Sequence, residues 1–396
     1  MHEIDESIGL MEPMLIADNA RQRGELSDLA LELAQKSSGL LHSLPMHMVD
    51  SLATLVRSMN CYYSNLIEGH NTHPIDIERA LKQDLSDNPR QRDLQLEAKA
   101  HIMVQQWIDA GGVGEQALSA ASIRMIHQKF CELLPDELLW VEHPTTGERL
   151  RVVAGEYREN DVQVGRHIPI KSASLSRFME RFDEAYARLG KTDMIFAAAC
   201  AHHRLLWIHP FLDGNGRVAR LVSHAVLLHT LNTGGLWSVA RGLARNVEAY
   251  KSHLAACDLP RRNDLDGRGS LSEEALVAFT KFFLTVCIDQ VDFMENLIQP
   301  QALRTRIQRW ADESIRMEKL PPKSGAVLDA ILYRGELPRS EVAAIVGTGD
   351  RQARRILSAL LEAEVVSAES TRAPLRLVFP ARLAGEWMPG LFPDKA

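Results

Sequence analysis

Twelve consecutive residues, from His209 to Arg220, combine side chains and backbone features that could act together in one reaction. Gly214 and Gly216 let the backbone approach an anion closely, and they lead into the N-terminus of an expected helix. The first N–H groups of a helix have no partner inside it, and the helix dipole favours negative charge there. Asn215 adds a neutral donor between the two glycines. We therefore expect an anion-binding loop that suits phosphate.

Charged residues surround this loop. Arg217 and Arg220 are three residues apart and share a helix face, and two guanidiniums suit a di- or triphosphate. Asp213 offers an oxygen ligand where a nucleotide would bring Mg²⁺. His209 stands at the loop entrance, and the ordinary pKa of histidine suits a general base. Each feature alone is common in turns and solvated helices, but their joint occurrence favours a nucleotide site.

The elements around the loop are predicted to be helices. Residues 193–208 are apolar on nearly every face, which predicts a buried central helix, and a second helix is expected over residues 218–231. Between them, Pro210 and Gly214 indicate a tight loop. Residues 150–168 contain two short β-prone runs separated by glycine, which predict a hairpin.

The segment from His209 to Arg220 resembles the Fic family motif HxFx[D/E]GNGRxxR at every fixed position. The resemblance implies a mainly α-helical bundle with a β-hairpin flap, formed here by residues 152–168. It also implies protein adenylyltransferase activity with ATP as co-substrate. In that reaction His209 takes the proton from a Ser, Thr or Tyr hydroxyl of a target protein. The hydroxyl oxygen attacks the α-phosphate of ATP and pyrophosphate leaves.

The same resemblance assigns roles to the other residues of the site. Asp213 would hold Mg²⁺, and Phe211 would anchor the loop in the core. Tyr250 would line the adenine pocket, although a core tyrosine explains it equally well. The residues implied to bind phosphate are Gly214, Asn215, Gly216, Arg217 and Arg220.

A second segment, Ser64–Gly69, is similar to the family's inhibitory pattern [S/T]xxxE[G/N]. Ser64 and Glu68 are four residues apart and lie on one helix face. By resemblance, Glu68 pairs with Arg220 and withholds it from the γ-phosphate, while Ser64 helps to hold the glutamate. Because this segment precedes the motif, the chain resembles the N-terminally inhibited class. The alternative is an ordinary exposed glutamate near a helix end.

The length of 396 residues favours two or three domains. We expect a helical N-terminal region at 1–110, a catalytic core at 111–298, a helical linker at 299–322 and a C-terminal domain at 323–396. Three helices and a two-stranded wing in the last part predict a winged helix-turn-helix. Residues 323–379 contain eight basic and seven acidic side chains. DNA binding through residues 340–376 and protein binding therefore both stay open.

The composition suits a globular protein, with 45% hydrophobic and 24% charged residues and a net charge of -7. The acidic balance argues against a global nucleic-acid or membrane surface. Five scattered cysteines without a CxxC pair predict buried thiols in a reducing compartment. The acidic N-terminus and short apolar runs predict a cytoplasmic protein without a membrane segment. Adjacent His202 and His203 point about 100° apart on a helix, so we expect packing rather than metal binding.

Several functions stay open from sequence. The same site could remove AMP from a modified protein, with Glu68 positioning a water, or use another nucleotide-derived donor. The chain could also be a DNA-binding regulator that senses a nucleotide. Its target protein could be the chain itself, and a homodimer is a further alternative.

Overall fold

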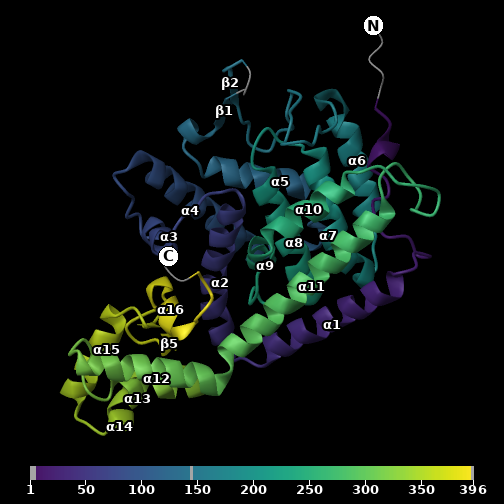
Figure 1. Cartoon of the computed structure of the whole chain (residues 1–396). Helices are drawn as coiled ribbons and strands as arrows, with labels where there is room; N and C mark the ends of the chain where they lie inside the picture. The colour runs from purple at the N-terminus through teal and green to yellow at the C-terminus, as the bar shows by residue number, and fades with distance from the viewer. Residues whose placement is uncertain (1–5, 143–145, 394–396) are drawn as a thin grey trace. The chain divides into compact units, whose positions relative to one another are not determined.

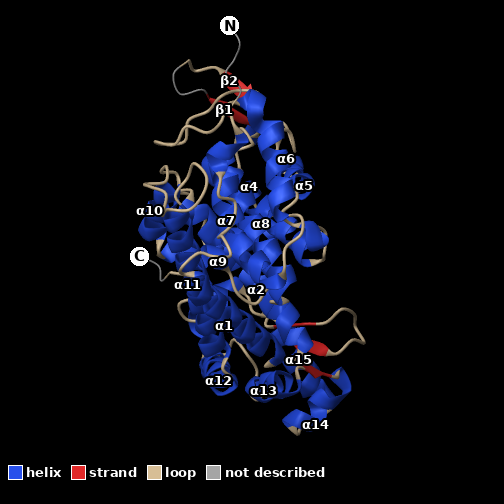
Figure 2. Cartoon of the chain, turned by 90° about the vertical axis from the view of Figure 1, so that its right-hand side faces the viewer, coloured by secondary structure: helices blue, strands red, loops and turns tan. Residues whose placement is uncertain are grey.

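The computed structural model describes residues 6–142 and 146–393 and is mainly α-helical (Figures 1 and 2). It divides into two compact units. The first contains the residues up to Ser38, Asn60–Thr233 and Ser238–Gln290, and the second contains Gly39–Met59, Gly234–Trp237 and the residues from Val291 onward. The four domain borders expected from sequence stay a prediction. Three helices supply residues to both units: α1 (Arg23–His42), α2 (Met46–Ile67) and α11 (Glu273–Ile298).

The first unit is built around two buried helices, α7 and α8, which pack along each other. Every residue of α7 from Ile195 to Leu205 is buried, as expected for a helix that is apolar on nearly every face. The helices that lie wholly in this unit are α3 (Pro74–Leu81), α4 (Pro89–Asp109), α5 (Ala120–Glu132), α6 (Leu175–Tyr186), α7 (Lys191–Ile208), α8 (Asn215–Leu231), α9 (Val239–Arg245) and α10 (Val247–Cys257).

The helix boundaries follow local chemistry. Pro74 and Pro89 occupy the first positions of α3 and α4, where the missing N–H costs nothing. Asn88 caps α4 by accepting a hydrogen bond from the Gln91 N–H at 3.2 Å. Gly69, with φ of 84°, follows the end of α2, where glycine adopts the left-handed conformation without strain.

The hairpin of the first unit lies earlier than expected. Strand β1 (Trp140–Glu142) pairs antiparallel with β2 (Arg149–Arg151), and residues 143–145 between them lie outside the described residues. The prediction of a hairpin over residues 152–168 is wrong, because this segment is irregular apart from one isolated bridge between Val164 and His167. Its backbone is tied instead to the loop that follows α7, as described below.

The second unit combines helices with a small antiparallel sheet of order β3-β5-β4. The three helices expected in this part of the chain are present at 324–334, 342–346 and 350–362, and β3 is an addition that the sequence did not predict. The assignment as a winged helix-turn-helix stays a prediction. The elements are α12 (Pro300–Arg316), α13 (Ser324–Arg334), β3 (Glu336–Leu337), α14 (Val342–Val346), α15 (Asp350–Glu362), β4 (Val366–Ser367), β5 (Leu375–Leu377) and α16 (Ala384–Trp387).

Short 3₁₀ turns complete the secondary structure. They span Ile8–Met11, Gly114–Gln116, Asp136–Leu138, Ser172–Ser174, Arg339–Glu341 and Ala381–Leu383. All five cysteines are free and buried, as predicted. Among the described residues, every helix is too short or too polar to cross a bilayer.

Candidate active site

The loop between α7 and α8 makes two left-handed bends. His209, the residue after α7, has φ of 53°, and Gly214, immediately before α8, has φ of 82°. Glycine adopts this conformation without strain. Gly214 has no side chain that could cap α8, so the first N–H groups of the helix keep their capacity to bind an anion. The loop therefore has the backbone geometry that the sequence predicted.

Asn215 braces the loop internally. Its side-chain Oδ1 accepts a hydrogen bond from the Phe211 N–H at 2.9 Å, and its Nδ2 donates to the Phe211 carbonyl at 2.8 Å. Phe211 is itself fully buried, as expected for an anchor. The sequence suggested that the Asn215 amide binds phosphate. In the structure both ends of the amide bind the loop backbone, and phosphate binding by Asn215 stays a prediction.

Arg158 is a second brace, which the sequence analysis missed. Its side chain is fully buried, and its Nε donates to the His209 carbonyl at 2.8 Å. Its backbone N–H donates to the Pro210 carbonyl at 2.9 Å. The guanidinium also donates to the carbonyls of Asn160 and Ile170. Arg158 thus joins the irregular segment after β2 to the loop. A lone arginine in a β-prone stretch gives no sequence indication of this role.

His127 of α5 supports the loop from another side and was also missed. Its ring stacks on Phe211, with centroids 3.8 Å apart and planes 3° from parallel. Its Nδ1 accepts a hydrogen bond from the Gly155 N–H at 3.0 Å. Burial lowers the pKa of His127 to about 4, so the ring is neutral near neutral pH. This histidine therefore acts as packing and as a hydrogen-bond acceptor.

Burial keeps the imidazole of His209 uncharged near neutral pH. Burial lowers its pKa to about 4, against the opposing effect of a hydrogen bond to the Leu206 carbonyl. That contact joins Nδ1 to the carbonyl oxygen at 3.4 Å. The imidazole is consequently uncharged over the neutral pH range, as a general base must be.

Arg220 is held by the segment that resembles the inhibitory pattern. The Arg220 side chain is 2% exposed, and its Nη2 lies 2.5 Å from Oε1 of Glu68. Its Nε donates to Oγ of Ser64 at 2.8 Å, and Nη2 also reaches the Ser64 carbonyl at 3.2 Å. Partial burial disfavours the charged form of Glu68, but Arg220 outweighs it and holds the pKa of Glu68 below its usual value.

Gly216 allows Glu68 to approach the N-terminus of α8. A Cβ added at Gly216 would collide with the Glu68 carboxylate. The carboxylate therefore stands beside the uncapped helix end, where an anion is favoured. Glu68 thus combines two interactions that a phosphate would use, the helix terminus and the Arg220 guanidinium.

Arg217 also has a carboxylate partner. Its Nη2 lies 3.2 Å from Oε2 of Glu97 on α4, and its guanidinium lies over the ring of Phe130 at 5.3 Å. The Arg217 side chain is 9% exposed. Both arginines that the sequence predicted for phosphate are thus present at the loop, each beside a glutamate.

Tyr250 lies in the core of the first unit. It is 2% exposed, and its hydroxyl is 2.7 Å from Nε2 of His202, whose Nδ1 is 2.9 Å from Oγ of Ser223. Burial raises the pKa of Tyr250 to about 12. These contacts favour the core-tyrosine alternative over a direct place in an adenine pocket. His202 is packed and hydrogen-bonded, as expected.

Asp213 is exposed at the loop surface. Within the described residues, no group of three or more His, Cys, Asp or Glu side chains could hold a metal by itself. One exposed carboxylate fits Mg²⁺, which usually binds through one or two carboxylates together with substrate phosphates and waters.

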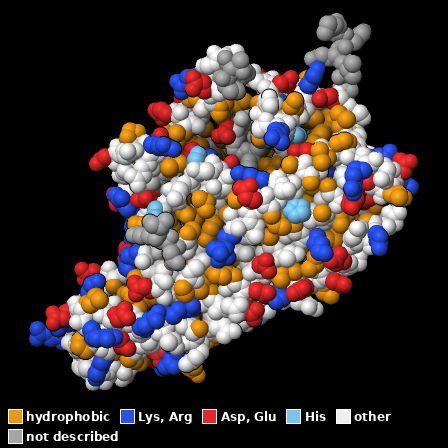
Figure 3. Space-filling view, in the orientation of Figure 1, with side chains coloured by type: hydrophobic (Ala, Val, Ile, Leu, Met, Phe, Trp, Pro, Cys, Tyr) orange, Lys and Arg blue, Asp and Glu red, His pale blue; other side chains and the backbone are white. Residues whose placement is uncertain are grey.

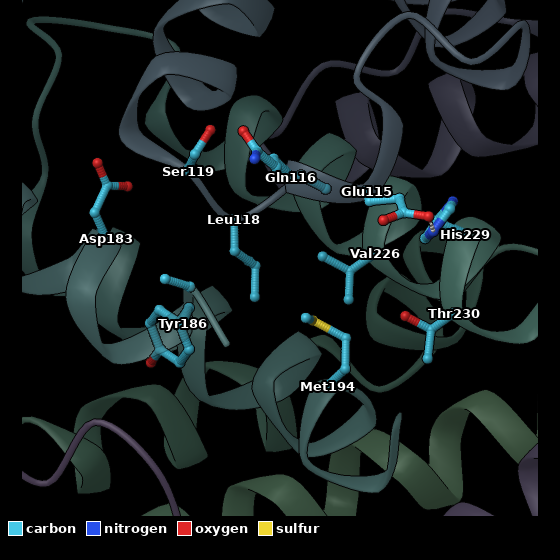
Figure 4. Close-up of a pocket in the computed structure, with 12 residues that line it drawn as sticks. Glu115, Gln116, Leu118, Ser119, Asp183, Tyr186, Met194, Val226, His229 and Thr230 are labelled. Carbon is cyan, nitrogen blue, oxygen red and sulfur yellow. Dashed lines mark ion pairs between the residues drawn. The ribbon is translucent and has the colours of Figure 1, made fainter. Parts of the chain in front are cut away.

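A cavity of about 280 Å³ lies away from the loop, between residues 115–119, α6, α7 and α8 (Figure 4). Leu118, Val226 and Met194 point into it. Asp183 and the ion pair of Glu115 with His229, 3.8 Å apart, stand at its edge. Residues of the loop do not line it.

Comparison with known proteins identifies the region that contains the loop. Residues 117–227 match the model of the Fic/DOC family. The chain carries a Fic domain. This match includes His209 and Arg220, whereas Ser64, Glu68 and Tyr250 lie outside it.

Curated relatives agree with this assignment. The chain is 30% identical over 171 residues to a protein named protein adenylyltransferase Fic from Nematostella vectensis, which covers 42% of this chain and 36% of the relative. It is 34% identical over 99 residues to the protein of that name from Drosophila ananassae, covering 24% and 20%. The chain thus spans about a third or less of the length of these relatives. A crystal structure of a Fic family protein from Desulfovibrio desulfuricans G20 matches with 16% identity and a TM-score of 0.49, over 88% of this chain and 96% of that one.

The bracing of the Fic loop by Asn215 can be tested through stability. Asn215→Ala removes the hydrogen-bond partners of the Phe211 N–H and carbonyl inside a buried loop. The free energy of unfolding should therefore fall by about 2–3 kcal/mol. Urea denaturation followed by circular dichroism measures this change. Asn160→Ala is the control, because that exposed side chain holds no part of the loop and its contact with Arg158 uses the backbone. Equal effects of both substitutions would contradict the bracing role.

Proposed function

We propose that this chain transfers AMP from ATP to a hydroxyl group of a protein and that Glu68 restrains the reaction. The observation that carries the proposal is the loop itself. An uncapped helix N-terminus stands between a neutral His209 and two nearly buried arginines. The names of the relatives support the same reaction, because both are called protein adenylyltransferase Fic and residues 117–227 of this chain match the Fic/DOC family.

The proposed step is a displacement at the α-phosphate. His209 accepts the proton of a Ser, Thr or Tyr hydroxyl, whose oxygen forms a new bond to the α-phosphorus. The bond from that phosphorus to the bridging oxygen breaks, and pyrophosphate leaves with the electron pair. Most of the rate acceleration in such transfers comes from positioning and charge stabilisation. Gly214 and Gly216 supply close backbone approach, and Arg217 and Arg220 supply charge to the outer phosphates.

Asp213 is the residue that would hold Mg²⁺ beside the phosphates. The ion supplies charge neutralisation when it is bound. The chain's own residues perform the remaining tasks: His209 accepts the proton, Arg158 and Asn215 fix the loop, and Phe211 anchors it.

The proposed restraint is a direct competition for Arg220. While Glu68 and Ser64 occupy its guanidinium, the γ-phosphate lacks a partner, and the carboxylate repels it from the end of α8. The α-phosphate then loses the orientation that in-line attack requires. The alternative reaction removes AMP from a modified protein, with Glu68 positioning a water, and it uses the same residues. The test below distinguishes the two reactions.

Glu68→Gly should raise AMP transfer about ten-fold or more, because Arg220 becomes available to the γ-phosphate. Intact mass after incubation with ATP and Mg²⁺ counts AMP adducts on the chain or on proteins of an added lysate. Glu68→Gly combined with His209→Ala should show none, since the base is missing.

The matched control for this experiment is Glu115→Gly. That glutamate is 87% exposed and lies outside the loop, so its substitution should leave transfer at the wild-type level. If Glu68→Gly is no more active than wild type, Glu68 is not inhibitory. If wild type removes AMP from a modified protein and Glu68→Gly does not, the reaction of this chain is AMP removal rather than AMP transfer.

The low pKa of His209 predicts an unusual pH profile. The neutral ring persists down to about pH 4. Between about pH 7.5 and 5.5, kcat/KM of Glu68→Gly should therefore stay nearly flat, whereas a histidine with the ordinary pKa of about 6.5 would lose about ten-fold. Calorimetric titration of Mg²⁺–ATP at both pH values separates nucleotide binding from proton transfer. A ten-fold fall without weaker binding would show that the base titrates near pH 6.5 and that the pKa of His209 is not depressed in the working enzyme.

A second candidate function, binding to duplex DNA, is favoured by one face of α15. Its buried face holds Ala353, Ile356 and Leu360. The exposed side holds three arginines that form no ion pair within the described part of the chain: Arg351, Arg354 and Arg355. Acidic and basic side chains are otherwise mixed over the surface in view (Figure 3). Contact with DNA would therefore depend on this helix rather than on a broad basic field.

Fluorescence anisotropy with a labelled duplex, repeated over a range of salt concentrations, tests this candidate. Arg351→Ala with Arg355→Ala should weaken binding and lower the salt slope by about 2, because two phosphate contacts are lost. Arg304→Ala is the control, since Arg304 in the same unit is already paired with Asp329 at 2.5 Å. Binding that is absent, or that responds equally to both changes, would exclude α15 as a DNA-contacting helix.

A further inference from the structure

Arg217 is enclosed by two elements outside its own helix. The guanidinium lies between the Glu97 carboxylate of α4, at 3.2 Å, and the ring of Phe130 of α5, at 5.3 Å. The ring is itself buried, with 3% exposure. A cation over an aromatic face and beside a carboxylate is already well stabilised. A phosphate must therefore displace or share the Glu97 interaction in order to use Arg217.

Glu97 is also connected to the segment that contains Glu68. The same oxygen, Oε2, lies 3.3 Å from Nδ1 of His70. The His70 backbone N–H donates to the Asn65 carbonyl at 2.9 Å, which folds the residues after α2 back onto the helix. The Glu97 side chain is 16% exposed, so water screens these charges weakly.

The two pairs form one electrostatic group. The pKa of Glu68 is held down by Arg220 first, and by Arg217 and His70 in addition. Two carboxylates and two guanidiniums therefore balance each other at the end of α8. A triphosphate would bring further negative charge to a place where two glutamates already stand.

We propose that Glu97 is a second restraining carboxylate, which lowers triphosphate affinity at Arg217 in addition to the effect of Glu68. This inference rests on the proposed nucleotide site and adds a regulator to it. Glu97 competes for the Arg217 guanidinium as Glu68 competes for Arg220. Removing Glu68 alone leaves one of the two phosphate-binding arginines occupied.

The test measures binding rather than activity. The dissociation constant of Mg²⁺–ATP is determined by calorimetry for Glu68→Gly and for Glu68→Gly with Glu97→Gln. The glutamine keeps the shape of the side chain and removes its charge, so affinity should rise about ten-fold. Adenosine, which has no phosphates, should bind both variants equally. Glu97→Ala in the same background should change affinity in the same direction.

Asp93→Asn in the Glu68→Gly background is the matched control. Asp93 lies one turn before Glu97 on α4. Asp93→Asn therefore removes one negative charge from the same helix, as Glu97→Gln does, but it keeps the contact between Glu97 and Arg217. A gain with Glu97→Gln but not with Asp93→Asn supports the inference. An unchanged or weaker ATP affinity with Glu97→Gln overturns it, because Glu97 then orients Arg217 for phosphate or only packs.

The same titrations separate this inference from the proposed reaction. If Glu68→Gly binds ATP and Glu97→Gln binds it more tightly, yet no AMP is transferred, the restraint stands and the reaction is wrong. If AMP is transferred and Glu97→Gln leaves affinity unchanged, the reaction stands and the restraint is wrong. Absence of ATP binding in every variant overturns both.

Discussion

The buried guanidinium of Arg220 needs an anion, and much of the surrounding structure follows from that need. Burying a charged group until it is 2% exposed lowers the free energy of unfolding by several kcal/mol unless the charge is paired. In this chain the pair is the Glu68 carboxylate, with Ser64 accepting a further hydrogen bond. A phosphate oxygen would meet the same requirement with similar geometry. The feature that would let α8 bind a nucleotide therefore also makes an internal carboxylate an effective competitor.

The competition has consequences only if the loop keeps its shape when its partner changes. A non-glycine residue in the left-handed conformation of His209 costs roughly 1–2 kcal/mol, so the bend must be held by its surroundings. Arg158 fixes the carbonyls of His209 and Pro210, Asn215 fixes both peptide groups of Phe211, and the His127 ring covers Phe211. These contacts come from three separate parts of the chain. Together they hold the loop in one conformation. The competition then changes the group that the arginines bind and leaves the loop as it is.

The sequence predicted the parts of this arrangement that depend on local pattern. The buried helix at residues 193–208, the glycine bends and the pairing of Glu68 with Arg220 all follow from spacing or from the motif. Arg158, His127 and Glu97 were missed, because each acts through a contact between residues far apart in the chain and none belongs to a periodic pattern. The hairpin was misplaced for the same reason. Residues 152–168 have β-prone side chains, but their hydrogen bonds go to other segments. Arg158 donates to the loop, and the Val152 N–H donates to the Leu139 carbonyl. The short strands at 140–142 and 149–151 have too few residues to show alternation.

The position of the two carboxylates along the chain separates the reacting groups from their restraint. The Fic family match begins at residue 117 and includes His209, Arg217 and Arg220. Glu68 and Glu97 both precede it, one after α2 and the other on α4. The arginines are thus fixed by the shared core, while their counter-charges come from a segment outside it. In the proposed function, these carboxylates set how strongly a phosphate must compete for the arginines, and the residues of the core carry out the transfer.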